Sequence, residues 1–253
     1  MPGEKGISVI DQTGAAGTEI GRGPLPYRPV ARDPVKEQVY RQLREAILDG
    51  QIEPGTTVTI QGLAEAFSVS AMPVREALHR LSEIGALSIV AGRSVGIPPL
   101  SVARLEDLSR VRIELEGTAA EWAAAASTPE LVVRLDELIA QMEGFTAAVD
   151  RKPFIPANRE FHFEIYRAAG SECLLATIEP LWLQIGPYLA LLRGSGNWRA
   201  ANMQHRLIRD ALARKDGHAA RAALKADIDE AAAILKDIIS MGQSQPNLTM
   251  GLR

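Results

Sequence analysis

The sequence predicts a mainly α-helical chain in two parts: a short helical segment that ends in a β-hairpin, and then an antiparallel bundle of long helices. Three observations lead to this prediction. Alanine is abundant while aromatic residues make up only 5% of the 253 residues, and this composition favours helices over a β-sandwich. Apolar residues recur at helical spacing over most of the chain. Short turn signals rich in glycine, proline or serine separate these stretches.

Composition narrows the class of protein. With 46% apolar residues the chain can bury a sizeable core, and its length suits two domains. The net charge is −3 and the sequence has no polybasic tail, which counts mildly against a nucleic-acid partner. Cys173 is the lone cysteine, and we find neither a signal-peptide pattern nor an uninterrupted apolar stretch that is long enough to span a bilayer. We therefore expect a cytoplasmic protein.

The first ordered element is expected after a flexible start. Residues 1–30 are rich in glycine and proline and predict a disordered arm. A helix should follow, because Asp33 can cap it, Pro34 suits its first turn and Gly50 ends it. Its apolar stripe consists of Val35, Val39, Leu43 and Ile47.

Two further helices, joined by a tight turn, are expected next. A short helix in 59–67 is followed by the break SVS at 68–70 and by a longer helix. Ser70 is placed to cap the longer helix, and Pro73 falls in its first turn, where a missing N–H costs no intrahelical bond. The apolar residues that can pack across the crossing are Leu63, Ala64, Phe67, Val74, Leu78 and Leu81.

The opposite face of the longer helix is predicted to be exposed. Once its apolar side is fixed, Arg75 and His79 project outward, and Ser70, Ala71 and Met72 lie at its start. A helix N-terminus with free N–H groups and an arginine suits phosphates and base edges alike.

A β-hairpin is predicted next. Leu87–Val90 and Val95–Ile97 are β-prone and flank a turn with Gly92 and Arg93. Together the pieces form a winged helix-turn-helix. The pattern alone leaves an αα-corner with a structural hairpin as an alternative.

The rest of the chain reads as nearly all helix. Ser101, Thr128 and Ser171 are candidate N-caps, and Gly170 and Gly194 end their helices. The candidate helices are 101–126, 129–149, 153–169, 172–193, 197–215 and 217–241.

Two histidines in this region are candidate metal ligands. Asn158 and His162 are four residues apart, so they share one face of their helix beside apolar neighbours. His205 lies on another helix with a marked apolar side. Imidazoles from two helices can meet inside a bundle and bind a divalent metal. Histidines that are simply hydrogen-bonded in the core remain the alternative.

Residues 39–97 resemble a known family of DNA-binding domains, the GntR-type winged helix. The resemblance is carried by VS..PVREAL.RL...G and the hairpin after it. It implies that Arg75 and the start of its helix enter the major groove, and that Gly92 and Arg93 form the wing tip.

Two departures from the family's pattern concern DNA recognition. The family commonly has an arginine where this chain has Ala71, and a charged stretch where it has Ile60, Gln61 and Gly62. We therefore expect a different operator preference, with compensation by Gln61, Met72 and the N-terminal arm. A lost arginine contact reduces base discrimination by about 1–3 kcal/mol.

Residues 101–241 resemble the FCD effector domain of FadR-type GntR regulators. That domain often holds a metal on an Asp-x-x-x-His pair and two later histidines. Asn158, His162 and His205 fall on the first three positions, and Asp227 stands where the last histidine usually appears. The set keeps one carboxylate and two imidazoles, so zinc, nickel or manganese are the metals that we expect.

The same resemblance implies a small carboxylate effector. Arg112 matches the arginine that precedes a Leu-Glu pair on the first bundle helix, and we expect it to meet the effector carboxylate. A salt bridge to Glu116 is the alternative. Tyr188 and Arg193 are further candidates for the pocket. His218 is rotated away from Asp227 on their helix and is expected at the surface.

The sequence therefore predicts a ligand-responsive transcription regulator that binds a palindromic operator as a homodimer and has no membrane partner. Repression is favoured over activation, which stays open. The alternatives are a metal-dependent enzyme that acts on a small organic acid within the bundle, and a helical scaffold without DNA affinity. The expected divisions are an arm at 1–30, the DNA-binding domain at 31–97, a linker at 98–101, the FCD-like effector-binding and dimerisation domain at 102–241, and a flexible tail at 242–253.

Overall fold

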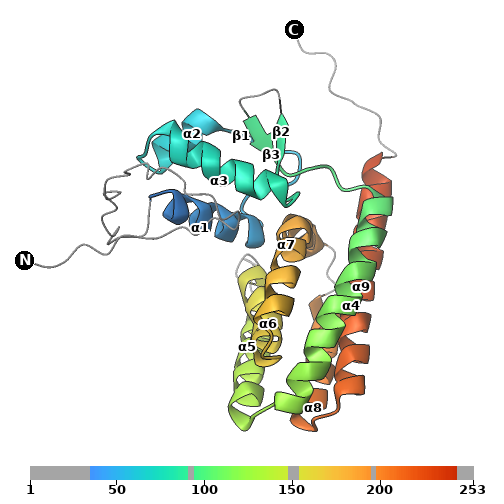
Figure 1. Ribbon diagram of the computed structural model, residues 1–253. Helices are drawn as coiled ribbons and strands as arrows, with labels where there is room; N and C mark the ends of the chain where they lie inside the picture. Colours follow the sequence, from blue (N-terminus) through green and yellow to red (C-terminus); the bar gives the residue numbers. More distant parts are fainter. Residues whose placement is uncertain (1–34, 91–93, 148–153, 195–197, 244–253) are drawn as a thin grey trace, which may run out of the picture. The chain divides into compact units, whose positions relative to one another are not determined.

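The structure is a computed structural model that describes residues 35–90, 94–147, 154–194 and 198–243 (Figure 1). The expected arm, the capping pair Asp33 and Pro34, and the wing-tip residues Gly92 and Arg93 lie outside these ranges. The expectation of a mainly helical chain is confirmed for the described residues.

The N-terminal part combines three helices with a small sheet (Figure 1). Its elements are α1 (Val35–Leu48), β1 (Thr57–Thr59), α2 (Ile60–Ala66), α3 (Ala71–Glu83), β2 (Ser88–Val90) and β3 (Ser94–Gly96). The strands are antiparallel in the order β1-β3-β2. The β2–β3 hairpin matches the expectation, whereas β1 was not predicted, because a three-residue strand is too short to show a period of two.

The helix-turn-helix forms as its apolar pattern predicts. Thr59 caps α2 by accepting a hydrogen bond from the Gly62 amide at 3.0 Å, and Ser68 takes up a φ of 54° in the turn. Ala64 is buried at the crossing, where its small side chain lets the helices approach. The α3 residues that seal the core are Val74, Ala77, Leu78 and Leu81.

Helix α1 covers the other side of this small core. Val39, Leu43 and Ile47 are buried as expected, but Val35 is 50% exposed at the helix start. Gly50 has a φ of 63°, a left-handed conformation that favours glycine and ends the helix.

The C-terminal part is helical throughout its described residues (Figure 1). Its elements are α4 (Val102–Ala126), α5 (Pro129–Ala147), α6 (Phe154–Ala168), α7 (Glu172–Leu189), the 3₁₀ segment η1 (Ala190–Gly194), α8 (Trp198–Ala213) and α9 (Gly217–Gln243). Ser101 and Ser171 cap α4 and α7 through their side chains. The helix expected over 172–193 ends at Leu189, and its last turns are 3₁₀.

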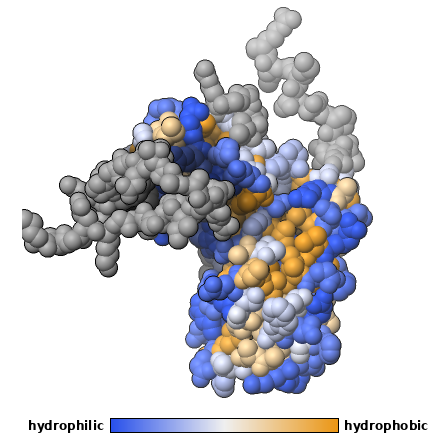
Figure 2. Space-filling view, in the orientation of Figure 1, coloured by the Kyte–Doolittle hydropathy of each residue, from blue (hydrophilic) through white to orange (hydrophobic). Residues whose placement is uncertain are grey.

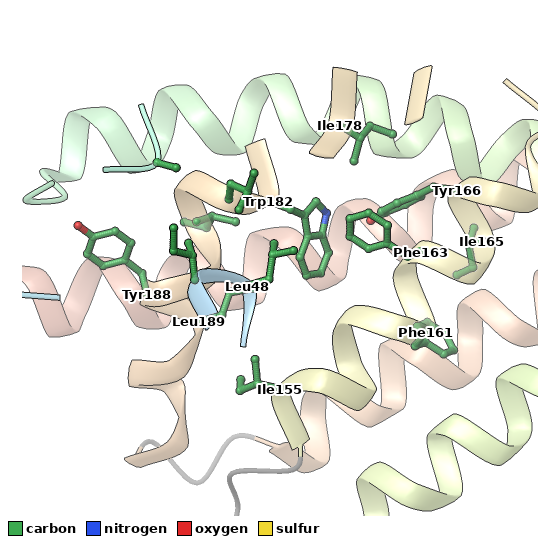
Figure 3. Close-up of a cluster of buried hydrophobic side chains, with 14 of the residues drawn as sticks. Leu48, Ile155, Phe161, Phe163, Ile165, Tyr166, Ile178, Trp182, Tyr188 and Leu189 are labelled. Carbon is green, nitrogen blue, oxygen red and sulfur yellow. The ribbon is translucent and has the colours of Figure 1, made fainter. Parts of the chain in front are cut away.

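Helices α4 and α9 run antiparallel and side by side (Figure 1). Ala119, Ala120 and Ala123 are fully buried on α4, and such small side chains let the two helices pack closely. Figure 3 shows the larger side chains that fill the middle of the bundle, with Trp182 beside Tyr166.

Helix α7 is the most apolar of the described helices. The segment Glu172–Leu192 is long and apolar enough to cross a membrane by length and composition, contrary to our expectation of no such stretch. Trp182, Leu183 and Ile185 are nevertheless buried against the rest of the chain. Its apolar character is therefore that of a core helix.

Candidate DNA-reading helix and metal centre

Helix α3 presents a polar face away from the apolar core. Arg75 and His79 are exposed, as are Ser70 and Met72 at the helix start, while Ala71 is half-buried. Ser70 occupies the N-cap position but makes no side-chain capping bond. Its hydroxyl and the first N–H groups of α3 are thus available to a ligand, as a groove-binding helix requires.

Arg75 differs from its charged neighbours because it has no ion-pair partner among the residues that the structure describes. Within the described ranges it forms no ion pair, whereas Arg80 pairs with Glu37 at 2.7 Å and His79 lies 3.5 Å from Glu83. An unpaired guanidinium on an exposed helix does not have to give up an internal ion pair before it binds a phosphate or a guanine.

The other candidate DNA contacts are less clearly placed. Gln61 is exposed on α2, where its side-chain amide donates to Glu65 at 3.1 Å. The wing-tip candidates Gly92 and Arg93 fall outside the described residues.

Three of the four candidate metal ligands meet inside the helical part. His162 on α6, His205 on α8 and Asp227 on α9 offer ligand atoms within 4.8 Å of one another. The carboxylate of Asp227 lies 3.4 Å from Nε2 of His162 and 3.6 Å from Nε2 of His205. Ligand atoms in a tetrahedral zinc site with bonds of about 2.0–2.1 Å lie about 3.3 Å apart. The cluster therefore needs little movement to hold a metal.

Each histidine is held by its other ring nitrogen. Nδ1 of His162 lies 3.3 Å from the Tyr166 hydroxyl, which itself donates to Glu116. Nδ1 of His205 lies 3.3 Å from the side-chain oxygen of Asn202. With an N–H at each Nδ1, both Nε2 atoms keep a free lone pair toward Asp227.

One buried atom indicates that the His162–His205–Asp227 cluster can bind a cation. Among the described residues Nε2 of His205 has no hydrogen-bond partner, although His205 is fully buried. A buried acceptor without a partner is costly, and a metal ion would satisfy it. The donor set therefore fits a divalent transition metal.

Burial sets the protonation of the three ligands. It lowers the pKa of His162 well below its usual range, with further lowering from His205 and Arg112. It lowers the pKa of His205 to about 3 and raises the pKa of Asp227 to about 7, the latter opposed by Arg112. Both imidazoles are thus neutral near pH 7, the form that binds metals, and Asp227 is poised to lose its proton to one.

A cavity of about 60 Å³ adjoins the cluster. Its lining includes Arg112, Asn158, His162 and Asp227, so the fourth candidate ligand faces the same space. Arg112 is buried and pairs with Glu116 at 2.7 Å, and its guanidinium lies over the Trp182 ring. The salt bridge to Glu116 is therefore confirmed, and the contact with an effector stays a prediction.

Tyr188 and His218 lie away from this cavity. Tyr188 is 4% exposed but does not line this cavity, where Leu189 and Leu192 form the wall instead. The side chain of Arg193 is outside the description, and His218 is exposed as predicted.

Sequence reasoning missed the residues that support the ligands. Tyr166 follows His162 by four residues and Asn202 precedes His205 by three, so helical spacing could have identified both. Arg159 carried no such signal, since it reaches from α6 to Glu45 at 2.7 Å and to Asp49 at 3.1 Å. This contact joins the helix that bears His162 to the end of α1.

Comparison with known proteins gives matches over both parts. Residues 35–97 match the family of bacterial regulatory proteins, gntR family, and residues 107–230 match the FCD domain. The HTH-type transcriptional regulator McbR of Escherichia coli (strain K12) is 33% identical over 155 residues, which is 61% of this chain and 70% of that protein. The HTH-type transcriptional repressor RspR of the same organism is 28% identical over 219 residues, covering 81% and 90%.

Solved structures of similar proteins match the fold of this chain. The structure of E. coli McbR/YncC matches with a TM-score of 0.76 and 30% identity, covering 82% of this chain and 99% of that one. A putative GntR regulator from Rhodococcus sp. RHA1 matches with a TM-score of 0.68 at 21% identity, covering 83% and 99%, and supports the fold alone.

With a winged helix followed by a helical domain, this chain is a two-domain transcription regulator of the helix-turn-helix type. With matches over both parts, the chain belongs to the GntR family and carries the C-terminal FCD domain of its FadR-type branch. Its relatives are regulators and not enzymes, which decides against the metal-dependent enzyme.

Proposed function

We propose that this chain is a metal-containing, carboxylate-responsive repressor that binds a palindromic operator as a cytoplasmic homodimer. The observation that carries the proposal is the buried His162–His205–Asp227 cluster beside a cavity that Arg112 also lines. Such a cavity offers a small acid both a metal and a guanidinium. The winged helix of the same chain supplies the DNA-binding element.

On the DNA side, α3 enters the major groove with Arg75 as its central contact. The support is the exposure of Arg75 and its lack of an ion pair within the described ranges. The bases are approached at the start of α3 by Ser70, Ala71 and Met72. His79 lies one turn after Arg75 on the same helix. Gln61 contacts the sugar-phosphate backbone of the DNA from α2. Gly92 and Arg93 reach the DNA from the wing.

In the helical domain, His162, His205 and Asp227 hold the metal, and the amide oxygen of Asn158 completes the set from the cavity wall. Two imidazoles and one carboxylate suit zinc or nickel, and manganese less well. When bound, the metal supplies a Lewis-acidic position for the effector carboxylate. Arg112 orients the same carboxylate, and Arg193 stays a further candidate for this contact.

The dimer is proposed to form through the exposed stripe of α4. Val111 and Trp122 are 43% and 49% exposed there, and Leu115 is half-buried between them. Figure 2 shows apolar surface on the face of the bundle where α4 lies. Arg110 and Glu114 flank the stripe, so a two-fold pairing can place opposite charges against one another.

Control of DNA binding is proposed to pass through α6. That helix carries both His162 and, three residues before it, Arg159, which is bound to Glu45 and Asp49 at the end of α1. A shift of α6 on effector binding would alter this contact and the spacing of the two winged helices. The proline-rich linker at 98–101 limits how far that spacing can drift. The repressor role follows RspR, a relative that is named as a repressor.

A binding titration tests the proposal. Fluorescence anisotropy of a labelled duplex from the region upstream of the chain's own gene is measured with the zinc-loaded protein and with the EDTA-treated protein. We expect tight, salt-dependent binding that Arg75→Ala removes and that Arg214→Ala, at an exposed position just past the end of α8, keeps. No binding to any such duplex would contradict the proposal, as would protein that is purified without a tag and binds no divalent metal.

A further inference from the structure

The cavity contains a second unsatisfied acceptor, apart from the metal ligands. Glu230 on α9 lines the cavity and accepts a hydrogen bond from Gln204 on Oε1 at 2.8 Å. Its other oxygen, Oε2, is buried and has no hydrogen-bond partner among the described residues. A buried carboxylate oxygen in this state favours a ligand that brings a donor.

Glu230 stands one helical turn beyond the metal ligand Asp227. Side chains three residues apart on a helix lie on one face with their Cβ atoms about 5–6 Å apart. Asp227 and Glu230 both line the cavity, so a ligand whose carboxylate bound a metal on Asp227 could place a donor near Glu230. A donor on the α carbon, next to the carboxylate, is the one that this short separation suits.

The charges around the cavity indicate what kind of donor this is. Once a metal displaces the proton of Asp227, the carboxylates of Asp227 and Glu230 in the lining and of Glu116 beside Arg112 bring three negative charges, and Arg112 is the one permanently charged cation among the described lining residues. A divalent metal balances the two charges in excess. A simple monocarboxylate would add an uncompensated negative charge in a buried place, whereas an ammonium group on the same molecule removes it.

The rest of the lining is apolar. The apolar lining residues are Phe154, Ile155, Trp182, Leu189, Leu192, Ile228, Ala231 and Ile234. A hydroxyl or second carboxylate placed against this wall would lose its hydrogen bonds to water without replacement. The cavity of about 60 Å³ holds roughly four to six water-sized groups, at about 10–15 Å³ each. The tail of the ligand is therefore apolar and short.

We propose that the effector is a small α-amino acid with an aliphatic side chain. Its carboxylate binds the metal and Arg112, its ammonium donates to Oε2 of Glu230, and its side chain contacts the wall around Trp182. The inference rests on the carboxylate effector of the proposed function and adds the ammonium and the apolar tail.

Isothermal titration of the full-length, zinc-loaded protein with three matched ligands tests this inference. L-Valine carries both groups, 3-methylbutanoate lacks only the ammonium, and L-threonine has the shape of valine with a hydroxyl in the tail. We expect valine to bind about 10- to 100-fold more tightly than either of the others, the range for a hydrogen bond to a charged group.

Two variants test whether Glu230 causes the preference for valine. Glu230→Gln should bring valine to the affinity of 3-methylbutanoate and leave the affinity for 3-methylbutanoate unchanged. Asp229→Asn, the neighbouring exposed residue on α9, should keep the preference for valine. Circular dichroism melting confirms that both variants are folded.

The outcomes separate this inference from the proposed function. If 3-methylbutanoate or threonine binds as tightly as valine, or if Glu230→Gln keeps the preference, the amino-acid effector is overturned while a carboxylate effector stands. If valine, threonine and 3-methylbutanoate all fail to bind the zinc-loaded protein, the carboxylate effector itself is overturned.

Discussion

As the pH is lowered, the protein should release a bound divalent metal, and the metal site should take up one proton for each metal ion released. The pKa of Asp227 is raised to about 7 by burial, so the metal must displace a proton from this carboxyl at and below pH 7. The pKa of His205 is lowered to about 3, and that of His162 is also lowered well below its usual range. Both imidazoles are therefore already neutral and release no proton.

The size of the effect follows from the fraction of Asp227 that is ionised. With a pKa of about 7, about half of the carboxyl is ionised at pH 7, about one tenth at pH 6 and about one hundredth at pH 5. The association constant for zinc should fall about fivefold from pH 7 to 6 and about tenfold from pH 6 to 5. Above pH 8 it should level off.

Two histidines with an ordinary pKa near 6.5 would give a different curve. Each would add a proton below pH 6, so the association constant would fall about 100-fold or more for each further pH unit. Titration calorimetry with zinc from pH 5 to 8, in buffers of different ionisation enthalpy, measures both the constant and the protons released. Release of two or more protons at pH 5 would refute the assignment of the proton to Asp227 alone.

Four further results are expected. Arg75→Ala should abolish specific retention of the operator in a mobility-shift assay, since one arginine contact to a base carries about 1–3 kcal/mol. Tyr166→Phe should weaken zinc binding about 10- to 100-fold in a competition titration, because it removes the group that orients His162. Arg159→Met should leave zinc affinity unchanged but reduce the effect of effector on operator binding, because it breaks the contact with Glu45 and Asp49. Zinc at about 100 times its Kd should raise the melting temperature of the native protein by roughly 5–10 °C, and EDTA should reverse the shift.

Matched controls make these results interpretable. Tyr188→Phe removes another buried tyrosine hydroxyl, which has no partner among the described residues, and should not change zinc affinity. Arg167→Met lies on the same helix as Arg159 but is more exposed, and it should keep the effector response. A Tyr166→Phe protein with native zinc affinity would show that His162 needs no support from this ring. An Arg159→Met protein with a native effector response would remove the proposed route through α6.

Much of the fold could be predicted from the sequence, because its apolar period and its caps agree. The stripe at Val39, Leu43 and Ile47 is buried, and Ser101 and Ser171 cap the helices that they were expected to cap. The strand β1 could not be predicted in this way. Its place depends on pairing with β3, a contact between residues far apart in sequence that three residues of local pattern do not encode.

The candidate metal centre was predictable in part. Helical spacing indicated that Asn158 and His162 share a face, and resemblance to the family placed His205 and Asp227 beside them. The unsatisfied oxygen of Glu230 could not have been foreseen, because it depends on which atom Gln204 leaves without a partner. Such information exists only once α8 and α9 are packed together.

Ser70 illustrates a limit of capping rules. It stands at the N-cap of α3 as predicted, yet its side chain makes no capping bond. The local pattern identifies the position correctly but not the partner of the hydroxyl. An N-cap whose hydroxyl is free is consistent with a helix end that meets DNA.

The most direct test of the account is a footprint of the native protein on its own upstream DNA, with Arg75→Ala alongside. We expect two protected half-sites whose centres lie about one helical turn, roughly 10 base pairs, or a multiple of it apart. We also expect that Arg75→Ala gives no footprint. Protection by Arg75→Ala equal to that by the native protein, or a single unpaired site, would contradict the claim that α3 reads a two-fold operator.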